Sequence, residues 1–189
     1  GFFTVEETAR MLEAGAKYGM RPKIHANEMA CSGGVQVGVQ YNALSCDHLE
    51  YVGDEEIEAF LHSECMPTVL PGAAFFLNMQ LSPVRKMMNA GLPVAMSSDF
   101  NPGSSPSGNM RFVASLAAIR MKMTPTEALW AATLNGAAAM GLSHDYGSIT
   151  VGKVANFFIT KPLSSFEFFN YAYNTPLIKS IFLRGERYK

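Results

Sequence analysis

The sequence predicts an α/β fold in which about four parallel strands alternate with helices. Apolar runs typical of strands alternate with segments whose apolar residues recur at helical spacing, and the connections between them are short. The strand segments are apolar on both sides, as expected when helices cover both faces of a sheet. A complete TIM-type (β/α)8 barrel needs eight such units and about 250 residues. This chain of 189 residues is therefore predicted to form half of such a barrel.

Local signals place each element of the first part. Residues Thr4 to Glu7 read as a capping box, in which a hydroxyl and a carboxylate cap the first turn, and a helix follows that Gly19 ends. The remaining elements expected up to residue 98 are a strand at 22–26, a helix at 34–41, a strand at 43–48, a helix from residue 54, a strand at 67–70, a helix capped by Ser82 with Pro83 in its first position and closed by Gly91, and a strand at 93–98.

Two more helices are expected before the residue composition of the sequence changes. One spans about residues 110–121, and the other begins at the capping box Thr124 to Glu127 and runs to Gly141. Beyond Gly147, β-branched and aromatic residues and turns dominate, and a strand pair with a turn at 184–185 ends the chain. We predict two parts, a barrel part over residues 1–146 and a small β part over residues 147–189.

Composition excludes several classes of protein. The formal net charge is −1 without any block of like charge, so neither nucleic acid nor an anionic membrane is expected as a partner. No apolar run approaches the roughly 18 residues that span a bilayer, and no signal segment begins the sequence, which favours the cytoplasm. Cys31, Cys46 and Cys65 are expected to be reduced thiols. Cys46 lies close to His48, but a small buried hydrophobe is its more ordinary interpretation.

Four polar residues lie where predicted strands end. His25 and Glu28 follow the first strand, His48 ends the second, and Asp99 follows the fourth. The carboxyl ends of parallel barrel strands share one face, where catalytic residues converge. Imidazole is the commonest metal ligand, and a nearby carboxylate can transfer protons. Together the four residues predict metal-assisted hydrolysis of a small molecule.

Each of these residues also has an ordinary structural interpretation. His-x-x-Glu is a weak motif alone, and a single histidine such as His48 is usually structural. Asp99 fits a turn-forming residue ahead of Pro-Gly. His62 and His144 are expected on the surface. The loop at 101–108 is rich in Gly, Ser and Pro but lacks the lysine of a phosphate loop, so it predicts a backbone site for a small ligand.

Four runs of residues resemble the fingerprints of the imidazolonepropionase family, within the amidohydrolase superfamily. They are His25-Ala26-Asn27-Glu28, Asp47-His48-Leu49-Glu50, Leu-Pro-Gly-Ala-Ala-Phe-Phe-Leu at 70–77 and Ser-Asp-Phe-Asn-Pro-Gly-Ser at 98–104, and the last two are the more specific. The similarity extends from about residue 4 to the end. It implies a hydrolase that opens the cyclic amide C–N bond of 4-imidazolone-5-propanoate to give N-formimino-L-glutamate, a step in histidine degradation.

The resemblance also implies roles for individual residues. His25 and Asp99 would be ligands of one divalent metal ion, zinc or iron. Glu28 would contact the substrate ring and transfer protons, and His48 would orient or deprotonate the attacking water. The substrate site would also be lined by Asn101, Gly103 and Ser104.

One feature of the family is missing. Its first barrel strand carries a His-x-His pair that supplies two metal ligands, and no His-x-His occurs in this sequence. The chain is therefore predicted to be the C-terminal half of the enzyme, ending in part of a composite β-sandwich domain, and activity of this half alone is doubtful. Because a half barrel leaves open strand edges, we expect a homo-oligomer or association with the missing N-terminal half.

Two other functions fit the same residues. A cytosine- or guanine-type deaminase of the same superfamily also uses His-x-x-Glu, a histidine and an aspartate, although the loop at 99–104 argues against it. Alternatively, the chain is a non-catalytic fragment whose polar strand ends merely bind a ligand. A His-x-His pair supplied by a second chain would distinguish these cases.

Overall fold

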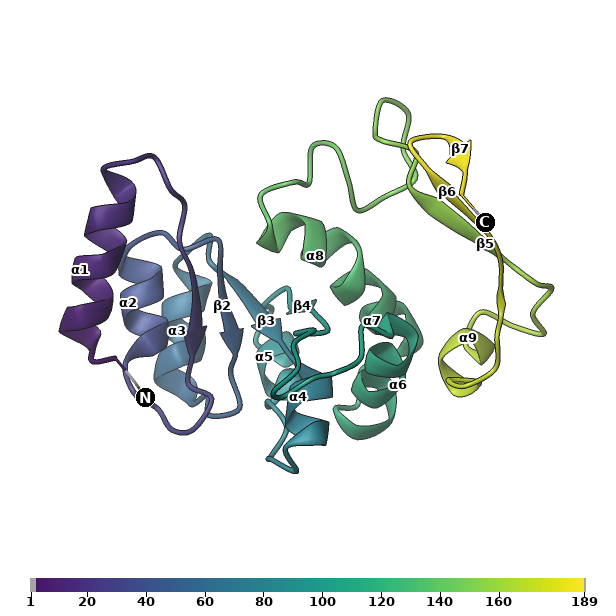
Figure 1. Cartoon of the computed structure of the whole chain (residues 1–189). Helices are drawn as coiled ribbons and strands as arrows, with labels where there is room; N and C mark the ends of the chain where they lie inside the picture. The colour runs from purple at the N-terminus through teal and green to yellow at the C-terminus, as the bar shows by residue number, and fades with distance from the viewer. Residues whose placement is uncertain (1–2, 189) are drawn as a thin grey trace.

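A four-stranded parallel sheet organises the first part of the chain (Figure 1). The computed structural model describes residues 3–188. Its strands lie side by side in chain order: β1 (Lys23–Ala26), β2 (Ser45–His48), β3 (Met66–Val69) and β4 (Ala95–Met96). One register row joins His25 to Asp47, Asp47 to Thr68, and Thr68 to Ala95, so these side chains point to the same face. The parallel α/β prediction is confirmed.

Helices alternate with the strands along the chain, as the sequence pattern indicates. The first three are α1 (Val5–Ala16), α2 (Gly34–Gln40) and α3 (Asp54–Leu61). The capping box at Thr4 is present, since the Thr4 hydroxyl accepts from Glu7 N at 3.2 Å and the Glu7 carboxylate accepts from Thr4 N at 2.9 Å. α4 (Pro71–Phe76) and α5 (Val84–Asn89) lie between β3 and β4, and α6 (Met110–Arg120) follows β4. α1 buries none of its residues.

The hydrophobic core lies between the sheet and the helices that follow its strands. Phe60 of α3, Met87 of α5 and Val69 of β3 are almost completely buried, as is Val113 of α6. Burying one such side chain contributes roughly 1.5–3 kcal/mol. This core holds the strand ends at fixed positions, which a site built on them requires.

Ser82 does not cap a helix, in contrast to the prediction. α5 begins at Val84 with Pro83 as its N-cap residue and has no side-chain cap. The Ser82 hydroxyl instead donates a hydrogen bond of 2.7 Å to the backbone carbonyl of His48. A buried carbonyl at the end of a strand needs a donor, and Ser82 supplies it.

The single helix predicted from residue 124 to 141 is divided. The structure has α7 (Pro125–Ala132) and α8 (Leu134–Ala139), separated by Thr133 with φ −122° and ψ −80°. The Thr133 hydroxyl donates to the carbonyl of Leu129 at 2.6 Å. A threonine hydroxyl competes with the backbone for such carbonyls and often bends helices. The bend brings α8 against β3 and β4.

The last part of the chain forms a separate antiparallel sheet of β5 (Phe157–Thr160), β6 (Ile178–Leu183) and β7 (Glu186–Arg187). The predicted turn at 184–185 joins β6 to β7. A short helix that the sequence did not predict, α9 (Phe168–Tyr171), lies between β5 and β6. The domain boundary near residue 146 stays a prediction.

One arginine attaches this last part to the first. The Arg111 guanidinium of α6 donates to the carbonyls of Thr175, Ala172 and Phe169, at 2.5, 2.7 and 3.4 Å. The same guanidinium lies 4.9 Å from the centre of the Phe169 ring. Burial lowers the pKa of Arg111, but the three carbonyls give the cation partners. The segment around α9 is thereby fixed on α6.

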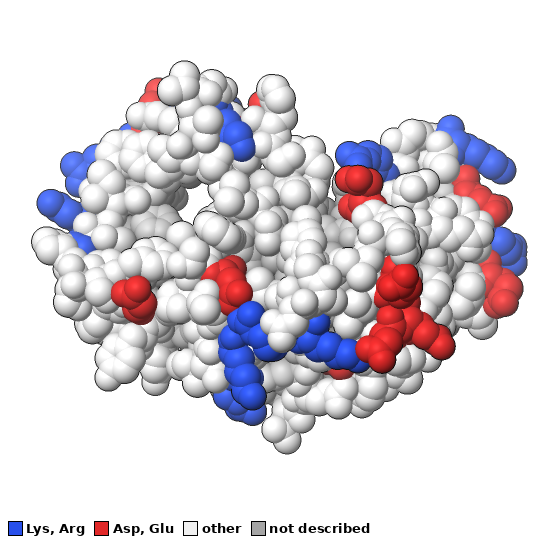
Figure 2. All heavy atoms as spheres, turned by 180° about the vertical axis from the view of Figure 1, so that it is seen from behind, with Lys and Arg blue, Asp and Glu red and all other residues white. Residues whose placement is uncertain are grey.

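The surface carries mixed charges. Figure 2 shows basic and acidic side chains interspersed, with large uncharged areas between them. Among residues 3–188, no helix combines the length and apolar character needed to cross a membrane.

Candidate active site

The chain turns sharply at the end of β1. Asn27 is buried, at 3% exposure, and has a left-handed backbone with φ 55°. Its side-chain amide donates to the carbonyl of Tyr51 at 2.9 Å, so the loops after β1 and β2 are joined. Asparagine tolerates this conformation better than most residues. The turn lies directly between His25 and Glu28, and it sets the direction of the Glu28 side chain.

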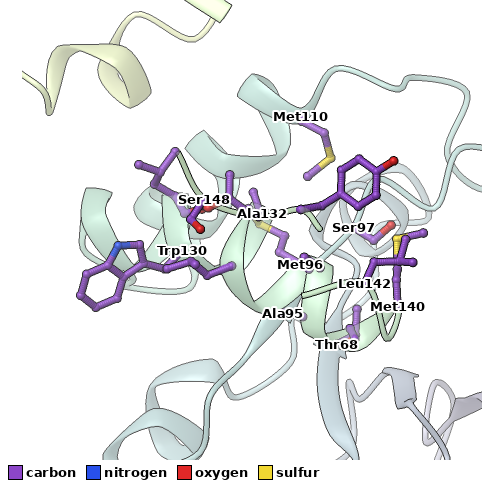
Figure 3. A pocket seen from close by; sticks show the side chains of 18 of the residues that line it. Thr68, Ala95, Met96, Ser97, Met110, Trp130, Ala132, Met140, Leu142 and Ser148 are labelled. Carbon is purple, nitrogen blue, oxygen red and sulfur yellow. The ribbon is translucent and has the colours of Figure 1, made fainter. Parts of the chain in front are cut away.

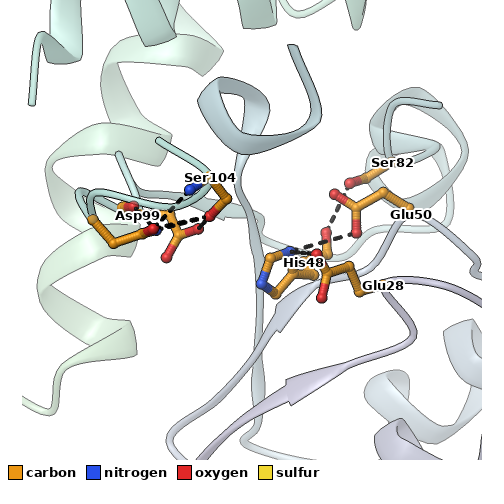
Figure 4. A network of polar contacts seen from close by, with 7 residues as sticks. Glu28, His48, Glu50, Ser82, Asp99 and Ser104 are labelled. Atoms are coloured by element: carbon orange, nitrogen blue, oxygen red, sulfur yellow. Dashed lines mark hydrogen bonds and ion pairs between the residues drawn. The ribbon is translucent and has the colours of Figure 1, made fainter. Parts of the chain in front are cut away.

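His48 lies at the centre of a group of polar side chains at the carboxyl end of the parallel strands (Figure 4). It ends β2, is 3% exposed and has φ 84°. Its ring centre lies 4.7 Å from that of His25. His48 Nδ1 lies 3.8 Å from Glu28 Oε1 and 3.8 Å from Glu50 Oε2. These distances exceed a hydrogen bond, so the two carboxylates act on the imidazole through their charge.

Charge and burial act in opposite directions on His48. Burial favours the neutral imidazole, whereas the carboxylates of Glu50, Glu28 and Asp99 favour the imidazolium, and together they raise the pKa of His48 above its ordinary value. A histidine in this environment can accept a proton near neutral pH. The arrangement is therefore suited to proton transfer.

Asp99 lies at the start of a loop that is held by its own hydrogen bonds. Asp99 has a left-handed backbone with φ 50°. The Asn101 side chain donates to the Asp99 carbonyl at 2.7 Å and accepts from the backbone N–H groups of Gly103 and Ser104, both at 2.8 Å. The Ser104 hydroxyl lies 3.4 Å from Asp99 Oδ2. The loop thus uses its amides internally to orient Asp99, and contact of Asn101, Gly103 and Ser104 with a substrate stays a prediction.

A cavity of about 1050 Å³ opens along the inner face of the sheet. Both His25 and Asp99 line it, together with Lys23 and Asp47. Most of its remaining wall is apolar and is formed by the ends of β3 and β4, by α7 and α8, and by the segment that runs from α8 into β5. Figure 3 shows Met96, Trp130 and Met140 around the cavity. Pockets of this size bind small molecules. The cavity connects the sheet edge with the inner face of the half barrel.

The structure adds a polar network that the sequence did not single out. The Lys23 ammonium contacts the Ser45 hydroxyl and donates to the carbonyl of Ala139 at 3.0 Å. The Ser45 hydroxyl donates to Asp47 Oδ1 at 2.5 Å. Residues Lys23, Ser45 and Asp47 share the cavity face by strand alternation, a signal that was available in the sequence. Lys23 and Ser45 begin their strands, and the bond from Lys23 to Ala139 indicates a structural role in joining β1 and β2 to α8.

Metal binding is incomplete in this chain. Within residues 3–188, no group of three or more His, Cys, Asp and Glu side chains is placed to hold a metal ion. A mononuclear site needs about three protein ligands. His25 and Asp99 line the same cavity, but they do not complete a metal site.

The other two histidines and the two buried cysteines have no part in the site. The side chains of His62 and His144 are 76% and 96% exposed, and each pairs with a neighbouring carboxylate, as predicted for surface residues. Cys46 and Cys65 are buried free thiols with their sulfurs 3.6 Å apart. The contact with Cys65, together with burial, raises the pKa of the Cys46 thiol. Cys46 is therefore a buried structural residue.

Comparison with known proteins gives a consistent result. Residues 3–185 match the model of the amidohydrolase family. The chain is similar to the imidazolonepropionase of Flavobacterium johnsoniae, with 53% identity over 98% of this chain and 45% of the relative. It is also similar to the imidazolonepropionase of Geobacillus thermodenitrificans, with 45% identity over 82% of this chain and 37% of the relative. The chain thus spans less than half the length of these curated relatives.

Solved structures show the same fold at low sequence identity. A crystal structure of an adenosine deaminase from Xanthomonas campestris with bound zinc has a TM-score of 0.81 and 20% identity, over 97% of this chain and 48% of that chain. A guanine deaminase from E. coli has a TM-score of 0.78 and 18% identity, over 97% of this chain and 51% of that chain. These structures show the fold alone, whereas the family model and the two relatives confirm the resemblance found in the sequence motifs.

Proposed function

Because this chain belongs to the amidohydrolase family, we propose that it forms the C-terminal half of an imidazolonepropionase. The complete protein would hydrolyse the cyclic amide C–N bond of 4-imidazolone-5-propanoate to N-formimino-L-glutamate, a cytoplasmic step of histidine degradation. The match to relatives of that name over 98% of this chain carries the proposal. The deaminase alternative has weaker support, because it rests on structures that are at most 20% identical.

In this proposal, Glu28 and His48 manage the protons of the reaction. The Glu28 side chain is 35% exposed and therefore accessible to a ligand, whereas the His48 side chain is 4% exposed. With 3.8 Å between Glu28 Oε1 and His48 Nδ1, a small movement brings the two groups into hydrogen-bond range. Glu28 would contact the substrate ring, and His48 would orient or deprotonate the attacking water. The loop residues Asn101, Gly103 and Ser104 would complete the substrate contact.

The proposal includes one divalent metal ion, zinc or iron. His25 and Asp99 would supply two of its ligands, because both line the cavity at the sheet edge. The other ligands would come from outside this chain, since the described residues offer no complete set.

The open inner face of the sheet supports a partner. The cavity of about 1050 Å³ has a largely apolar wall, and α1 buries none of its residues. Open strand edges and exposed apolar faces favour association. We propose that the N-terminal half of the enzyme covers this face, and that the isolated chain forms homo-oligomers instead. Light scattering of the dilute chain tests this, and a stable monomer contradicts it.

The decisive experiment measures hydrolysis of 4-imidazolone-5-propanoate by the longer protein that contains this chain. Mass spectrometry should detect N-formimino-L-glutamate as the product, with cytosine and guanine as control substrates. Release of ammonia from either base, without hydrolysis of the imidazolone, would favour the deaminase alternative. Absence of all three reactions would favour a binding function.

A further inference from the structure

The buried carboxylate of Glu50 has no role in the function proposed above. Glu50 is 2% exposed, and its Oε2 is buried without a hydrogen-bond partner among the described residues. Within the same part of the chain, His48 Nδ1 is likewise buried and without a partner. The two atoms lie 3.8 Å apart. Leaving such groups unpaired is costly, and the cost is avoided if they bond to each other.

The backbone holds both residues in place for this contact. The Ser82 hydroxyl donates to the carbonyl of His48 at 2.7 Å, and the Gln80 side chain donates to the carbonyl of Glu50 at 2.7 Å. Both ends of the segment 48–50 are therefore fixed by the segment that precedes α5. Only side-chain rotation is needed to shorten the distance between His48 Nδ1 and Glu50 Oε2 by about 1 Å into hydrogen-bond range.

Glu28 competes for the same nitrogen but is less suited to holding it. Its Oε1 is also 3.8 Å from His48 Nδ1, but the Glu28 side chain is 35% exposed, compared with 1% for Glu50. Water can solvate Glu28 and leave it free to move toward a ligand. Glu50 has no such alternative. Figure 4 shows the imidazole between these two carboxylates on one side and Asp99 on the other.

We propose that Glu50 is a positioning residue for His48: its carboxylate accepts a hydrogen bond from Nδ1–H and thereby leaves Nε2 as the free nitrogen. The bond made by one ring nitrogen sets the state of the other. A histidine held in this way presents an unprotonated Nε2 on the side of Asp99. The tautomer of His48 is a property of the chain and does not depend on the proposed function. Only the expected effect on turnover rests on that function.

The tautomer can be measured directly on the ¹⁵N-labelled chain. The sequence has four histidines, so a long-range ¹H–¹⁵N spectrum separates their imidazoles, with exposed His62 and His144 as internal references. Because the pKa of His48 is raised, the spectrum is recorded at increasing pH until the His48 signals no longer change, so that the neutral imidazole is observed. We expect the Nδ1–H form for His48 in the wild type and in Glu50→Gln, which keeps an acceptor oxygen, and its loss in Glu50→Met. A wild-type His48 that is protonated on Nε2 overturns the proposal.

Two control variants separate this role from general effects of burial and charge. Glu56→Met removes another buried carboxylate, one that accepts from Gly53 N at 2.8 Å and from Gln36 at 3.1 Å, and it should leave the His48 tautomer unchanged. Glu28→Met should also leave it unchanged. Loss of the Nδ1–H form in Glu28→Met but not in Glu50→Met would assign the role to Glu28 instead. The wild-type spectrum remains decisive if Glu50→Met does not fold.

Turnover by the longer protein provides a second test. Supporting residues of this kind typically change activity roughly 10- to 100-fold, so Glu50→Met should lower kcat by that factor with little change in KM, and Glu50→Gln should restore most of it. Wild-type kcat in Glu50→Met overturns the positioning role while the proposed function stands. If the wild type hydrolyses no imidazolone, the proposed function fails, and the tautomer result still decides the role of Glu50.

Discussion

An ion pair between α5 and α7 makes the stability of this chain depend on pH. The Arg85 guanidinium donates to both carboxylate oxygens of Glu127, at 3.1 and 2.6 Å. This pair, with the hydrogen bonds of the cap at Thr124, lowers the pKa of Glu127 from 4.5 to about 2. At 1.36 kcal/mol per pKa unit, that difference corresponds to roughly 3 kcal/mol. Because the side chains are 33% and 24% exposed, water screens the pair, and we expect about 1–2 kcal/mol.

The sign of the effect follows from the lowered pKa. The stabilisation is complete above pH 4.5, the ordinary value for the carboxyl, and is lost as pH falls toward 2. In Arg85→Met the bridge is absent, so the free energy of unfolding should be about 1–2 kcal/mol lower than in the wild type near pH 7, and this gap should narrow toward pH 3. The bond from Arg85 to the Lys122 carbonyl, 2.5 Å long, contributes independently of pH.

Urea unfolding followed by circular dichroism between pH 3 and 7 measures this gap. Glu127→Gln is the matched variant, because its amide oxygen can still accept from Thr124 N, which lies 2.7 Å from Glu127 Oε2 in the wild type. Both variants should show a weaker pH dependence than the wild type. A gap that stays constant over this pH range would refute the reasoning, because the bridge would then contribute nothing through its charge.

Three further predictions concern the site and the last part of the chain. In the longer protein, Glu28→Gln and His48→Ala should each lower turnover roughly a hundredfold or more while the fold is retained, since both would transfer protons; near-normal turnover would remove that residue from the mechanism. The isolated chain should bind zinc or iron weakly, because residues 3–188 supply only His25 and Asp99 of the expected ligands, and a stoichiometric metal found by elemental analysis after dialysis would contradict this. In Arg111→Met, backbone amides around α9 should exchange faster than in the wild type, while those of the rest of the core stay unchanged, because three carbonyls lose their donor. Unchanged exchange around α9 would show that Arg111 does not hold this segment.

The order of helices and strands could be predicted because local signals and global fold agree. Capping boxes at Thr4 and Thr124 mark helix starts, and both are present. Apolar runs between short turns correspond to strands β1 to β4, although β4 is reduced to Ala95–Met96. Such agreement between local propensity and tertiary packing is what lets a sequence specify one structure. The residues at which the strands begin and end were less predictable, because the length of a strand depends on pairing with its neighbours.

The features that escaped prediction depend on contacts between distant segments. Ser82 is a residue type that commonly caps helices, but its hydroxyl donates to the carbonyl of His48, which lies 34 residues earlier in the chain. The helix α9 is held by Arg111, which lies more than 50 residues earlier in the chain. Glu50 lies in a motif with His48, yet its burial could not be read from the sequence. In each case a tertiary partner decides the local outcome.

Several residues in and around the candidate site have a left-handed backbone. Asn27, His48, Leu49 and Asp99 all have positive φ, at 55°, 84°, 66° and 50°. Such conformations cost about 1–3 kcal/mol each and persist only where the surroundings enforce them. Asn, Asp and His are the residues that tolerate them best, so three of the four positions are filled accordingly. Buried Leu49 is the exception, and its backbone N–H donates to the carbonyl of Ala26 at 3.1 Å.

This strain has a geometric consequence. A strand that continued past His48 would carry the chain away from β1, whereas left-handed residues turn it back, so that Leu49 N reaches Ala26 and Tyr51 N reaches the Asn27 carbonyl at 3.0 Å. The turn folds Glu50 inward, so that its carboxylate lies 3.8 Å from the imidazole instead of in water. Replacing Leu49 by glycine should relieve the strain but also free this turn. Because Leu49 is fully buried, Leu49→Ala is the control, since it also loses the buried side chain but keeps a Cβ at the left-handed position. If the left-handed turn holds the site, Leu49→Gly should lower turnover of the longer protein more than Leu49→Ala does; equal loss of turnover in the two variants would mean that the turn serves packing only.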